Sequence, residues 1–237
     1  MFEIATSLSN LDLPKVVLAI GSLGTAAYGV VDATKGFGGG ISNRGFGDIK
    51  GVISKLIPPE SANVSPDAAL NLASALRTLR ANWLNGMLLG DQKSVAKALV
   101  KLNLTPGNAS HMAAATGVDK DVLAGIATKM GSSTALSPQE TDVYGRFDLL
   151  LSALLDQGYQ RADQRYRNSA KLLAVFIAIF LAIVGARIVV GDAFFSNGSE
   201  VLRALIAGLL ATPLAPIAKD LSSAIQAGAK AAQSWSK

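Results

Sequence analysis

The chain lacks cysteine and has a single histidine, His111, among its 237 residues. Without cysteine it can form no disulfide, thiolate nucleophile or cysteine metal site, and one histidine excludes a multi-histidine site within the chain. Charged residues are scarce at 16 %, against roughly one quarter in an average soluble domain. No Ser/His/Asp set and no carboxylate dyad is visible, so the sequence predicts no catalytic, cofactor-binding or metal residues.

Apolar and small residues are abundant instead. Half of the residues are hydrophobic, 23 are glycine and only 6 % are aromatic. Closely packed membrane helices have this profile. The formal net charge is +5, which in a membrane protein more often reflects cytoplasmic loops and anionic lipid headgroups than a nucleic-acid partner.

Three apolar runs predict three transmembrane helices. The clearest, residues 172–191, reads LLAVFIAIFLAIVGARIVVG, and about twenty such residues cross the ~30 Å hydrocarbon core of a bilayer. The others are residues 16–31 and 201–218. A signal peptide is the alternative interpretation of the first run. Its leading segment is not basic, however, and no convincing cleavage site follows it.

Small residues and prolines predict how these helices pack. Gly21, Thr25 and Gly29 recur every four residues, and such a small-residue face lets another helix approach closely. The alternative is that glycine is simply common in membrane helices. Pro213 and Pro216 each remove a backbone donor, so the third helix should bend or loosen there. The freed carbonyls would need a partner such as Thr212 or a neighbouring helix.

Basic residues predict the orientation. They crowd the start of the second run (Arg161, Arg165, Arg167, Lys171), follow the first (Lys35, Arg44, Lys50, Lys55) and follow the third (Lys219, Lys230, Lys237). By the positive-inside rule, the N-terminus is outside, and residues 34–170 and the C-terminus are cytoplasmic. Tyr166 lies among the arginines, which is typical of a membrane surface. We therefore assign Arg161, Arg165, Tyr166, Arg167 and Lys171 to an anionic lipid surface and call them the surface collar.

The expected organisation has four parts: residues 1–35 with the first crossing, a Gly/Pro-rich linker over 36–64, a helical cytoplasmic region over 65–170, and a transmembrane hairpin with a C-terminal helix over 171–237. Residues 36–51 contain seven glycines, so no regular element is expected there. A phosphate-binding loop is the alternative, but GFGGG matches neither nucleotide-binding pattern.

Helical periodicity marks the cytoplasmic region. Helices are expected from Ser65, from Asp91 to Asn103 and from Asp119 to Met130, with His111 in a loop. Lys93, Lys97 and Lys101 form a stripe that is solvated or meets anionic headgroups. Residues 113–123 resemble a helix-turn-helix. The helix that would enter the DNA groove begins Asp119-Lys120-Asp121, and its two carboxylates would oppose binding to phosphates. No nucleic-acid partner is therefore expected.

Residues 137–140 read Ser-Pro-Gln-Glu, a capping box with proline at the first helical position. No strong helix breaker follows before Gly191. We therefore predict one helix of about fifty residues that leaves the cytoplasm and crosses the membrane, spanning roughly 75 Å.

The C-terminal third resembles an uncharacterised group of bacterial inner-membrane proteins with one N-terminal crossing, a helical cytoplasmic region and a C-terminal hairpin. The matching residues are Phe147-Asp148, Tyr159-Gln160-Arg161, Tyr166-Arg167 and residues 215–221, where the aromatic residues of that group's last motif are missing. The resemblance implies a topology and an inner-membrane location, but no activity.

The sequence thus favours a non-catalytic membrane subunit that acts through helix packing, in a homo-oligomer or in a larger membrane complex. The alternative is an oligomeric channel or transporter whose proline-kinked third helix lines the pore. The polar candidates inside or beside the crossings are few: Thr25, Asp32, Arg187, Arg203 and Thr212. No polar stripe of the kind a channel needs runs along any crossing.

Overall fold

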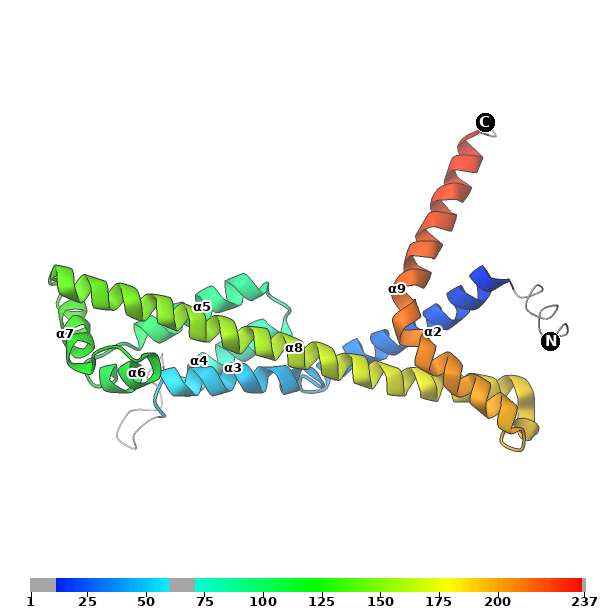
Figure 1. Ribbon diagram of the computed structural model, residues 1–237, viewed down its shortest axis with the longest axis horizontal. Helices are drawn as coiled ribbons and strands as arrows, with labels where there is room; N and C mark the ends of the chain where they lie inside the picture. The colour runs from blue at the N-terminus through cyan, green and yellow to red at the C-terminus, as the bar shows by residue number, and fades with distance from the viewer. Residues whose placement is uncertain (1–11, 60–70, 236–237) are drawn as a thin grey trace. The chain divides into compact units, whose positions relative to one another are not determined.

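The computed structural model describes residues 12–59 and 71–235, with side chains described through Ile225. Every regular element in these ranges is a helix (Figure 1). The chain divides into two compact units. The terminal unit comprises Met1–Gly38 and Asn168–Lys237, and the central unit comprises Gly39–Arg167.

The terminal unit holds three apolar helical segments. They are α2 (Leu13–Ala33), the second part of α8 (Pro138–Val190) and α9 (Gly198–Trp235). Short 3₁₀ turns, η1 (Thr34–Gly36) and η2 (Gly191–Phe194), follow α2 and α8. Each of the three helices is long and apolar enough to cross a membrane. The all-α class and the three candidate spans predicted from the sequence are confirmed.

The long helix α8 begins at the predicted capping box. The Ser137 amide donates to Glu140 Oε2 at 2.7 Å, and the Glu140 amide donates to Ser137 Oγ at 3.3 Å. Lys129 Nζ donates to the same carboxylate at 2.7 Å. The hydrogen bond from Lys129, followed by those from Ser137, lowers the pKa of Glu140 to about 2. The helix then continues for 53 residues, as the absence of breakers predicted.

The glycine-rich segment is more ordered than the sequence suggested. Residues Ser42–Leu56 form helix α3, so the expectation of no regular element over 36–51 is wrong. A Cβ built at Gly45 would lie 2.6 Å from the Ala162 carbonyl oxygen, and one at Gly158 would lie 2.7 Å from Val52 Cγ2. These glycines let α3 and α8 approach closely, and that packing outweighs the low helix propensity of glycine.

The central unit has a conventional hydrophobic core. Around α8 and α3 it contains α4 (Leu72–Leu84), α5 (Leu89–Leu102), α6 (Ala109–Thr116) and α7 (Lys120–Gly131). Large side chains fill the core, among them Phe46, Ile49, Ile53, Leu79, Trp83, Met112, Leu123, Phe147, Leu151 and Tyr159. His111 lies in α6, so its predicted place in a loop is wrong. Ser65 lies outside the described residues.

The lysine stripe of α5 lies against α8. Lys97 and Lys101 both pair with Asp148, at 2.6 and 2.5 Å, and Lys93 pairs with Asp156. Burial opposes ionisation of the Asp148 carboxyl, but hydrogen bonds from Lys101 and Lys97 outweigh burial and keep its pKa below the usual value. The stripe is therefore an interhelical contact within the central unit.

Replacing Asp148 should destabilise the central unit. Asp148→Asn leaves two lysines without their counter-ion, so we expect the unfolding free energy to fall by about 1–2 kcal/mol. Trp83 fluorescence in a Trp235→Phe background reports this unfolding during a urea titration in mild detergent. Because the Asp148 pKa is lowered, its stabilisation is complete above the ordinary pKa of 3.8 and is lost as the pH falls further.

The control is Asp142→Asn, which removes an exposed charge from the same helix. It should leave the urea midpoint within error of the wild type. Equal loss of stability in Asp142→Asn and Asp148→Asn would show that the lysine pairing contributes nothing specific.

Candidate functional site

Helix α9 touches α2 at the level of the backbone. A Cβ built at Gly24 would lie 2.0 Å from the carbonyl oxygen of Ala211, and one at Gly21 would lie 2.1 Å from Ala218 Cβ. Ala27, three residues beyond Gly24, is fully buried. Because only glycine leaves room for such a contact, α2 and α9 pack in the way that small-residue faces of membrane helices do.

The face of α2 that contacts α9 differs from the small-residue face that the sequence predicted. Gly21 belongs to both, but the contact continues through Gly24 and Ala27, at intervals of three residues. Thr25 and Gly29 are exposed, and a Cβ at Gly29 would meet nothing within 4 Å. Within one chain, therefore, Gly29 is not part of the α2–α9 contact, and Thr25 lies only at its exposed edge. Their packing against a second chain stays a prediction.

A second close contact joins α9 to α8. A Cβ at Gly208 would lie 2.5 Å from the Cα of Ile179. On α8, Ala170, Ala174 and Ala178 are buried at successive intervals of four residues. Small residues thus line the interior of the terminal unit on all three helices, and α9 contacts both of the others.

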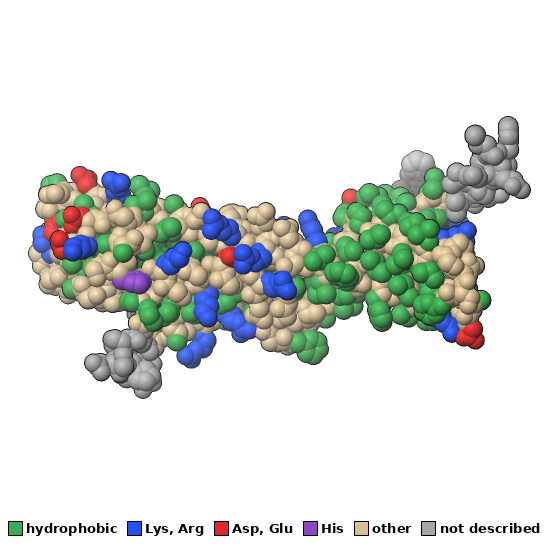
Figure 2. Space-filling model, turned by 60° about the horizontal axis from the view of Figure 1, so that its bottom comes forward, with side chains coloured by type: hydrophobic (Ala, Val, Ile, Leu, Met, Phe, Trp, Pro, Cys, Tyr) green, Lys and Arg blue, Asp and Glu red, His purple; other side chains and the backbone are tan. Residues whose placement is uncertain are grey.

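Burial in the terminal unit is the reverse of burial in a water-soluble domain. Its buried side chains are mostly glycine and alanine, whereas large apolar side chains are exposed, among them Leu172, Phe176, Phe180, Ile188, Val189, Leu202, Leu209 and Ile217. Figure 2 shows hydrophobic side chains gathered over one face of this unit and lysine and arginine over the central unit. Such an exterior is favourable in hydrocarbon and costly in water.

Helix α9 bends near its middle (Figure 1), where Pro213 and Pro216 lie inside the helix. Neither proline can donate to the carbonyl one turn earlier, which loosens the helix at this point. Thr212 is buried but its hydroxyl has no hydrogen-bond partner in the structure. Of the two partners expected for the freed carbonyls, Thr212 is therefore wrong, and a neighbouring helix stays a prediction.

Contacts between α2 and α9 run in reverse order. Gly21 meets Leu214 and Ala218, whereas Gly24 meets Ala211 and Ala215. Residue numbers thus fall along α9 as they rise along α2. The part of α9 that follows Ala211 therefore runs back toward the N-terminal end of α2.

Part of the surface collar belongs to the central unit. Arg165 Nε lies 3.2 Å from Asp48 Oδ2, and the Tyr166 ring meets the Trp83 ring edge-on at 6.1 Å between centroids. Arg161 and Lys171 are exposed, and Arg167 pairs with Asp163 at 2.7 Å. Sequence reasoning missed the contacts with Asp48 and Trp83 because these two partners are distant from the collar in the chain.

The charges at the helix ends form local pairs: Asp32 with Lys35 at 2.5 Å, Arg203 with Glu200 at 2.7 Å, and Arg187 with Asp192. Among the residues that the structure describes, no three His, Asp or Glu side chains are grouped so as to hold a metal ion. The Tyr159 hydroxyl is buried, which raises its pKa, and it donates to the Gln92 carbonyl oxygen at 3.4 Å.

The chain matches no family model, no curated protein and no solved structure.

An added methyl group should lower the stability of the protein at Gly24 but not at Gly29. Gly24→Ala places a Cβ against the backbone of α9, so we expect α2 and α9 to move apart and the melting temperature in detergent to fall, at a cost of about 1–3 kcal/mol. Gly29→Ala fills open space and raises helix propensity, so it should be neutral or slightly stabilising. Thermal unfolding followed by circular dichroism makes the comparison.

A bifunctional maleimide between cysteines introduced at Ser22 and Ser222 provides a second readout, because the chain has no cysteine of its own. Gly24→Ala should lower the crosslinking yield and Gly29→Ala should not. Equal stability and equal yield in the two variants would contradict the backbone contact.

Proposed function

We propose that the chain is an integral membrane protein that acts through contacts between helices, without catalytic turnover. The observation that carries this proposal is the reversed burial of the terminal unit: small residues inside and large apolar residues outside. Lipid is the solvent in which this exterior is stable. The central unit keeps large residues in its core and suits water. The membrane is the bacterial inner membrane, as the resemblance of the C-terminal third implies.

The protein is further proposed to assemble, either with copies of itself or within a larger membrane complex. The supporting observation is that Gly29 is an exposed small residue on α2, and that a Cβ there would meet nothing within 4 Å. A partner helix could approach α2 closely there, as it does at Gly24.

The proposed topology follows from connectivity and from the reverse pairing of α2 and α9. If residues 39–167 stay in the cytoplasm, α2 enters from outside and α8 returns there. The first half of α9 then runs inward beside α8, as the Gly208 contact indicates. The second half turns at the prolines and runs back beside α2. The C-terminus then emerges on the side of the N-terminus, in place of the cytoplasmic side that the lysine count predicts.

Single cysteines test this topology, because the natural chain contributes no background. In sealed vesicles of known orientation, a membrane-impermeant maleimide should label Ser196→Cys and Ser234→Cys from the outside. It should label Ser133→Cys only from the cytoplasmic side. Labelling of Ser234→Cys together with Ser133→Cys would show that α9 crosses the membrane completely. Labelling of all three from one side would overturn insertion itself.

Gly29→Leu tests the assembly. The added side chain blocks close approach at the exposed face but keeps the helix apolar, so the variant should insert normally. We expect the mass of the detergent-solubilised particle, measured by light scattering with a detergent correction, to shift to smaller species. Val189→Leu is the control, because it adds bulk at a side chain that is 85 % exposed on another helix.

A mass unchanged by Gly29→Leu would contradict the proposed interface. Purified wild-type protein that is monomeric and brings no partner from the membrane would contradict assembly altogether.

A further inference from the structure

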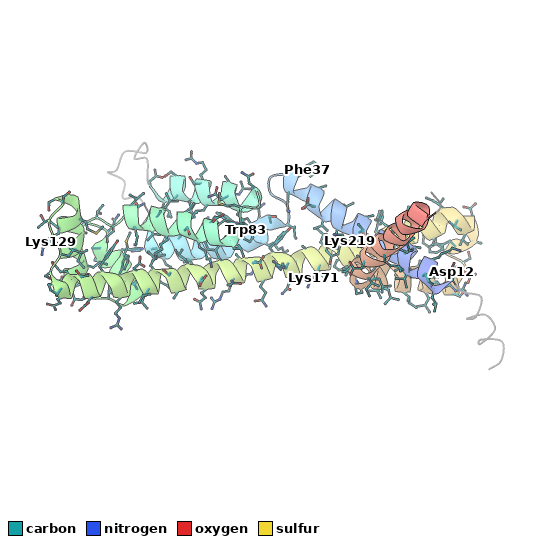
Figure 3. All side chains as sticks on the ribbon, turned by 90° about the horizontal axis from the view of Figure 1, so that it is seen from above. Asp12, Phe37, Trp83, Lys129, Lys171 and Lys219 are labelled. Carbon is teal, nitrogen blue, oxygen red and sulfur yellow. The ribbon has the colours of Figure 1, made fainter. Side chains whose placement is uncertain are left out.

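A polar cleft lies between α2 and α9. Its volume is about 410 Å³, and its lining residues are Leu18, Ser22 and Thr25 from α2 and Ala218, Lys219, Ser222 and Ser223 from α9. Figure 3 labels Lys219 where α9 passes α2. Four of these residues carry hydroxyl groups, and of the described lining residues only Lys219 carries a charge. We call this site the hydroxyl cleft.

The hydroxyl cleft is unusual for the unit that contains it. The exposed side chains of the terminal unit are largely apolar, whereas hydroxyls and an ammonium group gather here. Polar groups that face hydrocarbon without partners are costly. In a membrane, the ammonium group of Lys219 therefore needs an anionic partner, which acyl chains cannot supply.

The hydrogen-bonding capacity of the cleft defines the occupant's chemistry. Thr25 Oγ1 donates to the Gly21 carbonyl at 3.1 Å, and Ser223 Oγ donates to the Lys219 carbonyl at 3.0 Å. With their protons in use, these two oxygens are acceptors toward a ligand. Lys219 supplies three donors and a positive charge. The cleft thus suits a ligand that joins an anionic oxygen to hydroxyl donors.

The depth of the cleft agrees with a lipid headgroup. Leu18 lies five residues after the start of α2 at Leu13, and Lys219 follows directly after the third apolar run, residues 201–218. At 1.5 Å per residue, both positions are within about 8 Å of the end of their apolar segment. A lysine at this depth can direct its ammonium group to the headgroup region.

We propose that the hydroxyl cleft binds the phosphodiester headgroup of an anionic phospholipid that carries hydroxyl groups, as a glycerol headgroup does. Lys219 binds the phosphate oxygens, and Thr25 and Ser223 accept hydrogen bonds from the headgroup hydroxyls. The bound lipid would stabilise the bend of α9 against α2. This inference rests on the proposed membrane insertion, because a headgroup reaches the cleft only from a bilayer.

Native mass spectrometry of the full-length protein in mild detergent tests the proposal, with phosphatidylglycerol and phosphatidylcholine offered at equal concentrations. We expect retained phosphatidylglycerol adducts in the wild type and few phosphatidylcholine adducts. Lys219→Gln should lower phosphatidylglycerol occupancy about five-fold, since one charge near the surface contributes roughly that factor. Lys219→Arg should retain binding.

Two further variants separate the cleft from general effects. Lys120→Gln removes an exposed charge at the start of α7, outside both the cleft and the surface collar, and should leave occupancy unchanged. Ser22→Val narrows the cleft without altering charge and should lower occupancy. Circular dichroism melting confirms that each variant is folded before its adducts are compared.

Equal adducts with the two lipids, or equal losses in Lys219→Gln and Lys120→Gln, would overturn the headgroup site. So would saturation by inorganic phosphate or glycerol phosphate at the same concentration as the lipid, which would identify a free anion as the ligand. Flotation with lipid vesicles separates this failure from failure of the proposed function. A chain that floats but lacks selective adducts loses only the cleft proposal, and one that does not float loses membrane insertion.

Discussion

The contact between the α2 and α9 backbones determines which residues the terminal unit can bury. At Gly24 the carbonyl of Ala211 occupies the space where a side chain would begin. Helices this close have room only for glycine and alanine between them, so the large side chains of α8 and α9 must point outward. An exterior of phenylalanine, leucine and isoleucine follows directly from close packing inside. That exterior is costly in water and favourable in hydrocarbon, which supports the proposed membrane insertion.

Glycines also bring two helices close together in the central unit, but there the large apolar side chains stay buried. Gly45 and Gly158 bring α3 and α8 together, but Phe147, Leu151 and the other large residues remain inside. The surrounding helices α4 to α7 cover them, and lysines of α5 pair with acidic residues of α8. Close helix approach therefore does not by itself indicate a membrane. The decisive feature is where the large apolar side chains lie.

Local sequence signals predicted the helices well, and long-range contacts explain the errors. The capping box at Ser137 and the apolar runs were sufficient for α8 and the three candidate spans. Glycine content argued against α3 because propensity rules omit the tertiary contact that Gly45 makes with Ala162. The four-residue spacing of Gly21, Thr25 and Gly29 suggested one face, yet α9 uses Gly21, Gly24 and Ala27. The path of α9 determines which face of α2 is covered, and the sequence of α2 alone does not contain that information.

The bend of α9 connects packing, topology and the proposed ligand. A straight α9 leaving α8 would run parallel to α2 under the proposed topology, and Gly21 would then meet residues that precede those met by Gly24. The observed order is the reverse, so the turn near Pro213 and Pro216 is what permits both close contacts of α9. The turn also brings Lys219 and two serines beside Ser22 and Thr25. A polar cleft in an otherwise apolar unit is therefore a consequence of the bend.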